Sequence, residues 1–261
     1  MTLDVPDGRP LDVLACAAHP DDVELLAGGT MCLLARQGYR TGVVDFTRGE
    51  LGTRGTPELR LEEAAAAARV LGLQARENLG LPDGDIANTP AHRERLVRVV
   101  RRYRPHVVLL NAPVDRHPDH EAASKLGTDA LFYAGLEKLQ TAEDDGVLQA
   151  PWRPHHVLHY MGDRPFEPSL VVDVTAVWEQ RLAALAAFGS QFHNPAAEGA
   201  EDAAEPETFV SNRGFFEWIE ARARVYGARI GAPYGEPFLY RGGPVGVTDL
   251  MRTLDRERPF R

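Results

Sequence analysis

The chain has 261 residues, of which 44% are hydrophobic and 26% charged, enough to bury a full core within one large α/β domain over residues 1–261. Its net charge of −9 at pH 7 argues against nucleic-acid and anionic-membrane partners, which require a basic surface, and favours a small-molecule substrate. The sequence has neither a signal-peptide core nor an apolar run of membrane-spanning length, so we expect a cytoplasmic protein.

The first predicted strand, Val13 to Ala17, leads into the polar turn Ala18-His19-Pro20-Asp21-Asp22 and then into a helix that includes Met31 to Arg36. In an α/β sheet such a turn lies at the carboxyl end of a strand, where these folds bind ligands. An imidazole beside two adjacent carboxylates is costly unless something offsets the repulsion between the carboxylates, and a divalent cation would do so.

The next elements alternate between strand and helix. Strands are predicted at Arg40–Phe46 and Ala75–Leu81, and helices from about Glu58 and over Ala91–Tyr103. A fourth strand, 107–111, follows Pro105. These repeats predict a Rossmann-like three-layer sandwich whose mostly parallel central sheet begins with the order 3-2-1-4-5.

The fourth strand ends in a second polar turn, Asp115-Arg116-His117-Pro118-Asp119-His120, before a helix predicted over Glu121–Lys138. Because strands 1 and 4 are neighbours in this order, both turns face one crevice at the carboxyl ends of these strands. That crevice receives three histidines and three aspartates: His19, Asp21, Asp22, His117, Asp119 and His120.

The second half of the chain predicts strands at His155–Tyr160 and Leu170–Val174 and helices at Thr175–Phe188 and Ile219–Ile230. Between the helices, a segment rich in Ala, Glu, Pro and Asn predicts a mobile loop at about 193–210 that could act as a lid. Pro233 to Phe238 is expected to be a loop.

Two imidazoles and a carboxylate form the ligand set of a catalytic zinc site that keeps one position open for water. Bound zinc can lower the pKa of that water to about 7, a nearby carboxylate can take its proton, and a further histidine can stabilise the oxyanion. Cys16 and Cys32 lack paired-cysteine spacing, so the metal would have nitrogen and oxygen ligands. Spacing alone does not choose three ligands among the six residues, and either turn by itself could simply cap a helix.

The pair Ala18-His19-Pro20-Asp21-Asp22 and His117-Pro118-Asp119-His120 resembles the signature of the LmbE-like, or PIG-L, family of zinc-dependent N-acetylglucosamine (GlcNAc) deacetylases. The resemblance spans nearly the whole chain. It continues at Glu58-Leu59-Arg60, Asn78 to Asp83, Ser190-Gln191-Phe192 and Tyr234 to Phe238. This wider pattern is most similar to the bacillithiol-biosynthesis deacetylases, which implies removal of acetate from N-acetylglucosaminyl malate.

The resemblance implies that His19, Asp22 and His120 bind the metal. It implies that Asp21 is the general base and that His117, oriented by Asp119, is the oxyanion-stabilising acid. Arg60 would read the malate carboxylates and Asp83 would lie near the sugar hydroxyls.

One departure from the family concerns a mobile tyrosine near the reaction centre of some relatives, which is matched here by Phe215. Phenylalanine cannot donate a hydrogen bond, so either His117 and zinc suffice or another tyrosine, such as Tyr226, substitutes.

Other interpretations stay open. Fe²⁺ or another divalent metal could occupy such a site, and the resemblance implies a homo-oligomer. Within the same chemistry, the chain could be a bacillithiol S-conjugate amidase or a deacetylase of other GlcNAc or chitooligosaccharide substrates. From another class, it could be a non-catalytic Rossmann-like module that binds a sugar or nucleotide, which would show no product and no metal dependence.

Overall fold

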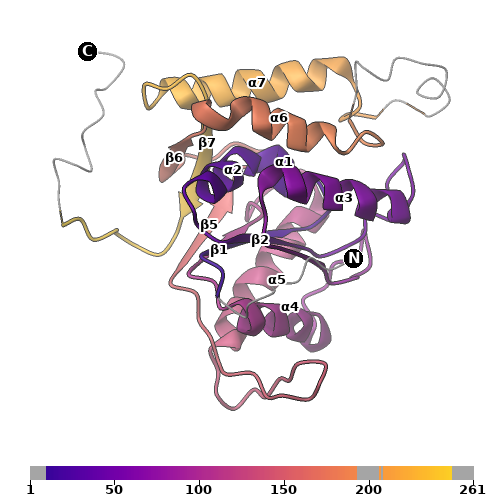
Figure 1. The fold of residues 1–261 in the computed structure, drawn as a ribbon, viewed down its shortest axis with the longest axis vertical. Helices are drawn as coiled ribbons and strands as arrows, with labels where there is room; N and C mark the ends of the chain where they lie inside the picture. The colour runs from indigo at the N-terminus through magenta and orange to yellow at the C-terminus, as the bar shows by residue number, and fades with distance from the viewer. Residues whose placement is uncertain (1–9, 193–205, 207, 249–261) are drawn as a thin grey trace.

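The computed structural model describes residues 10–192, 206 and 208–248 as a three-layer α/β sandwich around one seven-stranded sheet (Figure 1). The strands run in the order β3-β2-β1-β4-β5-β7-β6. Strands β1 to β5 pair in parallel, whereas β7 is antiparallel to both of its neighbours. The strands are β1 Val13–Ala17, β2 Thr41–Asp45, β3 Ala75–Asn78, β4 Val107–Leu110, β5 His156–Tyr160, β6 Leu170–Asp173 and β7 Gly235–Tyr240. The predicted Rossmann-like fold and the order 3-2-1-4-5 are confirmed.

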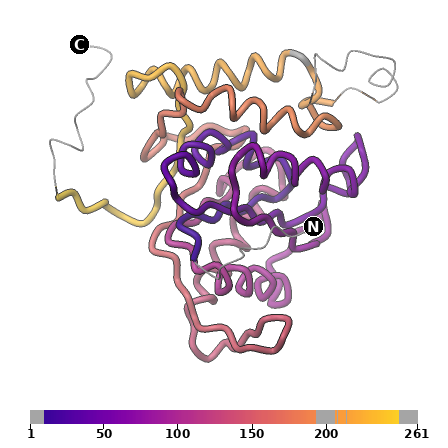
Figure 2. Tube along the Cα trace, viewed as in Figure 1, coloured from indigo at the N-terminus to yellow at the C-terminus, as the bar shows by residue number. Residues whose placement is uncertain are grey.

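Helices cover both faces of the sheet. α4 and α5 lie on one face, and α1, α2 and α3 lie on the other, with α6 and α7 beyond them (Figure 1 and Figure 2). No helix in the described ranges is long and apolar enough to span a membrane. The helices are α1 Asp22–Leu26, α2 Gly28–Arg36, α3 Pro57–Leu71, α4 Pro90–Tyr103, α5 Pro118–Ala134, the 3-10 turn η1 Thr175–Val177, α6 Trp178–Ala186 and α7 Arg213–Ala228.

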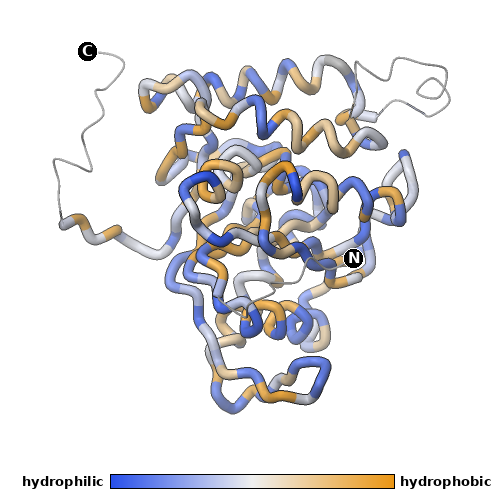
Figure 3. The backbone as a smooth tube through the Cα atoms, in the orientation of Figure 1, coloured by the Kyte–Doolittle hydropathy of each residue, from blue (hydrophilic) through white to orange (hydrophobic). Residues whose placement is uncertain are grey.

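Alternation along β1 divides the core between the two layers. Leu14 and Cys16 pack toward α4 and α5, whereas Val13 and Ala15 pack toward α1 and α2. Every residue of β1 is buried, as expected of a central parallel strand. Figure 3 shows the apolar residues gathered along the central strands, while α4 alternates between polar and apolar positions. Cys16 and Cys32 are both buried and free.

Three helices begin with the same local device, a capping side chain followed by proline. Thr56, Thr89 and His117 each accept a hydrogen bond from a backbone amide in the first turn of α3, α4 and α5. Proline then follows at the first helical position, where its missing N–H costs nothing. Helix α5 therefore starts at Pro118 rather than at Glu121, and its first turn contains Asp119 and His120.

A buried network of charged side chains links one edge of the sheet to helix α1. The guanidinium of Arg76 on β3 donates to both carboxylate oxygens of Asp45, at 2.8 and 3.0 Å, and also to Glu24. All three side chains are almost completely buried, and burial raises the pKa of both carboxyls although Arg76 opposes the rise. The network ties β2 and β3 to the helix that follows the first polar turn.

The prediction of a loop at Pro233–Phe238 is wrong, because strand β7 occupies Gly235–Tyr240 between β5 and β6. Proline inside a run argues against a central strand. The strand tolerates Pro237 because β5 pairs with β7 only from Phe238 onward, so on that side no ladder bond needs its missing N–H. The predicted mobile loop at about 193–210 falls mostly outside the described residues.

Candidate active site

The first polar turn places two adjacent aspartates in different surroundings. Asp21 has φ 126° and ψ −23°, a backbone conformation that costs a non-glycine residue about 1–3 kcal/mol, and such strain clusters at functional sites. Asp22 is the first residue of α1 and is buried. The carboxylates of Asp21 and Asp22 therefore have different partners, Arg60 for Asp21 and His120 for Asp22.

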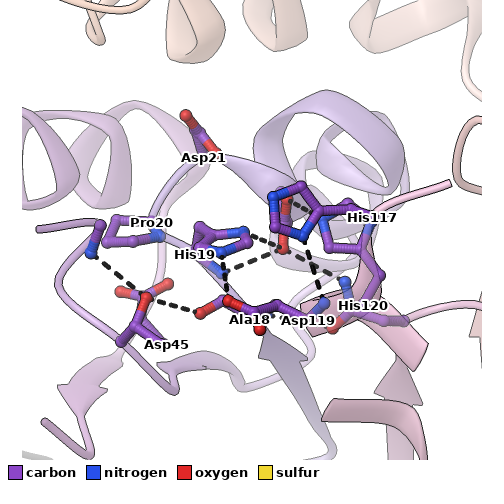
Figure 4. Close-up of polar contacts among 12 residues, drawn as sticks. Ala18, His19, Pro20, Asp21, Asp45, His117, Asp119 and His120 are labelled. Atoms are coloured by element: carbon purple, nitrogen blue, oxygen red, sulfur yellow. Dashed lines mark hydrogen bonds and ion pairs between the residues drawn. The ribbon is translucent and has the colours of Figure 1, made fainter. Parts of the chain in front are cut away.

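Three histidines from the two polar turns meet at the carboxyl ends of β1 and β4. The ring of His19 lies 4.7 Å from that of His117 and 5.6 Å from that of His120, measured between centroids. One nitrogen from each ring lies within 4.8 Å of the others, so the three could hold one metal ion. Figure 4 shows the three rings close together above the ends of the strands.

Asp22 contacts two of these histidines. Its Oδ1 lies 3.1 Å from Nε2 of His120, and its Oδ2 lies 3.7 Å from Nδ1 of His19. Asn111, just beyond β4, donates from its amide nitrogen to Asp22 Oδ2 at 3.2 Å and accepts from the Ala18 amide at 3.1 Å. The end of β4 thus fixes both the Asp22 carboxylate and the start of the first turn.

Asp115 holds His120 from behind and is absent from the predicted site residues. Its Oδ2 lies 2.7 Å from Nδ1 of His120, which leaves Nε2 facing Asp22. A carboxylate on the far nitrogen of a histidine is the usual support for a metal ligand. This rule could have identified Asp115 from the sequence, because it lies five residues before His120 in the same turn.

The other nitrogen of His19 faces two further carboxylates. Its Nε2 lies 3.1 Å from Asp83 Oδ1 and 3.2 Å from Asp119 Oδ2, and these three residues form a second group able to hold a metal. Asp83 comes from the loop after β3 and also accepts from the Leu51 amide. The turns that follow β1, β3 and β4 therefore converge on His19.

The carboxylate of Asp119 does not contact His117, the residue that it was expected to orient. It hydrogen bonds with His19 and accepts from the Gly84 amide at 2.8 Å. Instead, the backbone N–H of Asp119 donates to Nδ1 of His117 at 3.2 Å, because His117 caps α5. With Nδ1 accepting, neutral His117 carries its proton on Nε2.

Asp21 lines the same cavity, but its carboxylate points away from the three rings (Figure 4). It forms a short ion pair with Nη2 of Arg60 on α3, which also donates to the Pro20 carbonyl at 3.3 Å. Both side chains are almost completely buried. The structure therefore brings Arg60 to Asp21, and the arginine is already paired within the protein.

The electrostatics of the cluster favour a cation. Burial works against a charge on His19, yet hydrogen bonds with three carboxylates, led by Asp119, raise its pKa well above the usual value. Burial is likewise outweighed at His120, where the Asp22 charge raises the pKa to about 9. Burial and the neighbouring imidazoles lower the pKa of His117 and outweigh the opposing charges of Asp22 and Asp119.

The donor set fits a divalent metal ion. Nitrogen and carboxylate oxygen ligands suit zinc and the other first-row divalent ions. The carboxylates that favour protons on His19 and His120 create a field that would equally favour a metal, and Asp22 contacts both rings. Of the predicted ligands, Asp22 contacts both His19 and His120, whereas the groups whose ligand atoms all lie within 4.8 Å of one another are His19, His117 and His120, and His19, Asp83 and Asp119.

A cavity of about 310 Å³ opens over the cluster. Its described lining includes Asp21, Asp83 and Arg60 and extends to the aromatic residues of α7. Phe215, the residue at the expected tyrosine position, is part of this lining. No tyrosine belongs to the described lining, and Tyr226 is buried elsewhere on α7, so His117 is the better placed hydrogen-bond donor.

Comparisons with known proteins agree with this geometry. The family model described as PIG-L, GlcNAc-PI de-N-acetylase, matches residues 14–131, which contain both polar turns. A diacetylchitobiose deacetylase of Thermococcus kodakarensis is 32% identical over 190 residues, covering 69% of this chain and 70% of that protein. A 4-oxalmesaconate hydratase of Pseudomonas putida is 30% identical over 193 residues, covering 69% and 74%.

Among solved structures, the conserved protein TT1542 from Thermus thermophilus superposes with a TM-score of 0.77 at 40% identity. The match covers 91% of this chain and 98% of that one. The chain belongs to the PIG-L family of metal-dependent N-deacetylases.

Proposed function

We propose that the protein is a zinc-dependent hydrolase that removes the N-acetyl group from a GlcNAc conjugate, with His19, Asp22 and His120 as metal ligands. The observation that carries this proposal is the position of the Asp22 carboxylate, which contacts both imidazoles at the carboxyl ends of β1 and β4. Bound zinc would supply Lewis acidity and lower the pKa of a water molecule to about 7.

The protein's own groups then manage the protons. Asp21 is the general base that takes a proton from the attacking water, after its carboxylate has turned from Arg60 toward the cluster. His117 donates a hydrogen bond from its Nε2–H to the oxyanion, and Asp21 gives the proton that it took from the water to the departing amine. Asp119 positions His117 through its backbone amide.

The sugar is assigned to the side of the cavity formed by the loop after β3. Asp83 lies at the cavity wall beside His19 and is the proposed partner of the sugar hydroxyls. From sequence alone, the predicted substrate is the malate conjugate of bacillithiol biosynthesis, with Arg60 as the reader of its carboxylates. Because Arg60 is paired with Asp21, that role requires the arginine to change partners when substrate binds.

The direct test is acetate release from N-acetylglucosaminyl malate, plain GlcNAc and diacetylchitobiose. It is measured on purified protein before and after chelation and again with zinc, Fe²⁺ or Mn²⁺ restored. The proposal expects release that stops on chelation and returns with a divalent metal. Absence of release from every conjugate with every metal would overturn it.

The same assay decides between the remaining candidates. Preference for bacillithiol S-conjugates would indicate the amidase, and binding without product would indicate a non-catalytic sugar- or nucleotide-binding module. The hydratase among the relatives is named for a carboxylate substrate, but both arginines of the described cavity lining are paired with aspartates. We expect a homo-oligomer, which light scattering would detect.

A further inference from the structure

The cavity over the histidines has a second wall that the proposed chemistry does not use. It is formed by side chains from the segment after α6 and from α7, namely Phe192, Phe209, Val210, Phe215 and Trp218. Phe215 lies at its centre, with ring centroids 5.4 Å from Phe209, 5.6 Å from Trp218 and 6.0 Å from Phe192. We call these five residues the aromatic wall.

Part of the aromatic wall also lines a second hollow. A second hollow of about 530 Å³ is lined by three of its members, Phe209, Phe215 and Trp218, together with residues at the start of α7. Three side chains of the aromatic wall therefore line both hollows, one of which contains the histidine cluster. A substrate group attached near the amide could pack against the aromatic wall.

Two large apolar side chains are largely exposed at the rim of this cavity. Phe209 is 59% exposed, and Leu51, from the loop after β2, is 71% exposed. Exposed apolar side chains that gather around one cavity mark binding surfaces. An apolar ligand group would remove both from water, at about 25 cal/mol per Å² of buried area.

The charged groups at this end of the cavity are already paired. Arg60 contacts Asp21, and Arg116 lies 3.5 Å from Asp163 while its guanidinium covers the Phe209 ring at 5.0 Å. Among the described lining residues these are the two arginines, and none is a lysine. An anionic substituent would therefore have to displace a carboxylate, whereas an apolar one requires no exchange.

We propose that the aromatic wall binds an apolar, preferably aromatic, aglycone of the amino-sugar substrate. The inference rests on the proposed function. If the group removed is acetate, the acyl side of the amide carries only a methyl group, so the larger aromatic wall is left for the aglycone. The substrate class is thus a GlcNAc glycoside whose aglycone carries a ring or a short alkyl chain next to the sugar. The wall sets specificity and takes no part in the proton transfers.

The test compares phenyl and methyl glycosides of GlcNAc, each as both anomers, with N-acetylglucosaminyl malate and N-hexanoylglucosamine. Assays use zinc-loaded protein and measure acetate or hexanoate release. Burying one phenyl ring against the wall should raise kcat/KM at least about tenfold over the methyl glycoside of the same anomer. Equal kcat/KM for phenyl and methyl, or a preference for malate or for the longer acyl chain, would overturn the inference.

A pair of variants makes the assignment specific. Phe209→Ala should lower the phenyl-to-methyl ratio of kcat/KM about tenfold. Phe132→Ala is the matched control, because Phe132 is 56% exposed and lies under Arg153 at 4.9 Å, as Phe209 lies under Arg116, but it is on α5 away from the cavity. An unchanged ratio in Phe209→Ala would refute the wall, whereas no release from any glycoside by wild-type protein would refute the proposed function itself.

Discussion

Asp115→Asn exchanges a single oxygen for nitrogen behind a proposed metal ligand. Oδ1 of Asp115 accepts from the backbone amides of Arg116 and Asp163, at 2.6 and 3.0 Å, whereas Oδ2 faces Nδ1 of His120 at 2.7 Å. In the variant, the two amide donors keep the side-chain oxygen on their side, so the NH₂ group must face His120. Nδ1 of His120 then becomes an acceptor, and the proton moves to Nε2, the nitrogen that faces Asp22.

A protonated Nε2 cannot bind a metal, so in the variant the His120 proton must first return to Nδ1. There the Nδ1–H would face the NH₂ group of the new asparagine, and two donors would oppose each other. Loss of such a supporting carboxylate weakens metal affinity roughly 10- to 100-fold, or about 1.4 to 2.7 kcal/mol. Competition with a chromophoric zinc chelator at fixed pH measures this loss. Asp129→Asn is the matched control, because Asp129 lies on α5, the helix of His120, and pairs with Lys125 in an exposed contact; this variant should bind zinc as wild type does. Wild-type affinity in Asp115→Asn would refute the assignment of His120 as a ligand through Nε2.

Further variants test other parts of the site and the fold. Gly162→Ala should also weaken zinc binding at least about tenfold in the chelator assay, because a Cβ there would lie 1.8 Å from the Asp115 carboxylate; unchanged affinity contradicts this. His19→Ala should lose bound zinc, whereas Asp21→Ala should keep zinc, by elemental analysis, and lose at least about 100-fold in turnover. Arg76→Ala should lower the free energy of unfolding by about 3–5 kcal/mol in a denaturant titration, because two buried carboxylates lose their cation; a loss below about 1 kcal/mol would show that the network contributes little.

Much of the fold could be predicted because its signals are local. The buried run Val13–Ala17 and the alternation of strand and helix through Leu110 predict the positions of the first four strands, since parallel crossovers have a fixed hand. Strand β7 could not be predicted in this way. It enters the sheet between β5 and β6 from the end of the chain, and its Gly and Pro residues have the composition of a loop.

The candidate site also has a part that the sequence predicts and a part that it does not. Residues within the two polar turns could be predicted to converge, because strand order brings the turns together. The aromatic wall could not, because its members lie between residues 192 and 218 in two different parts of the chain and the packing of α7 brings them to the cavity. Phe215 stands out in the sequence as a departure from the family. Its contact with Trp218 is a local i, i+3 contact within α7, whereas its contacts with Phe192 and Phe209 join the helix to residues outside it.

Asp21 and Asp22 show where adjacency in sequence stops predicting chemistry. From sequence, two neighbouring aspartates would be expected to share an environment. Only the resemblance to the PIG-L family suggests different roles for them. The structure supplies the physical reason. The φ of 126° at Asp21 turns its carboxylate toward Arg60, while Asp22 enters α1 and faces the two imidazoles. Burial raises the pKa of Asp21, whereas at Asp22 the positive charge of His120 outweighs burial and lowers the pKa. The proposed base and the proposed ligand therefore differ in their electrostatic surroundings before any metal binds.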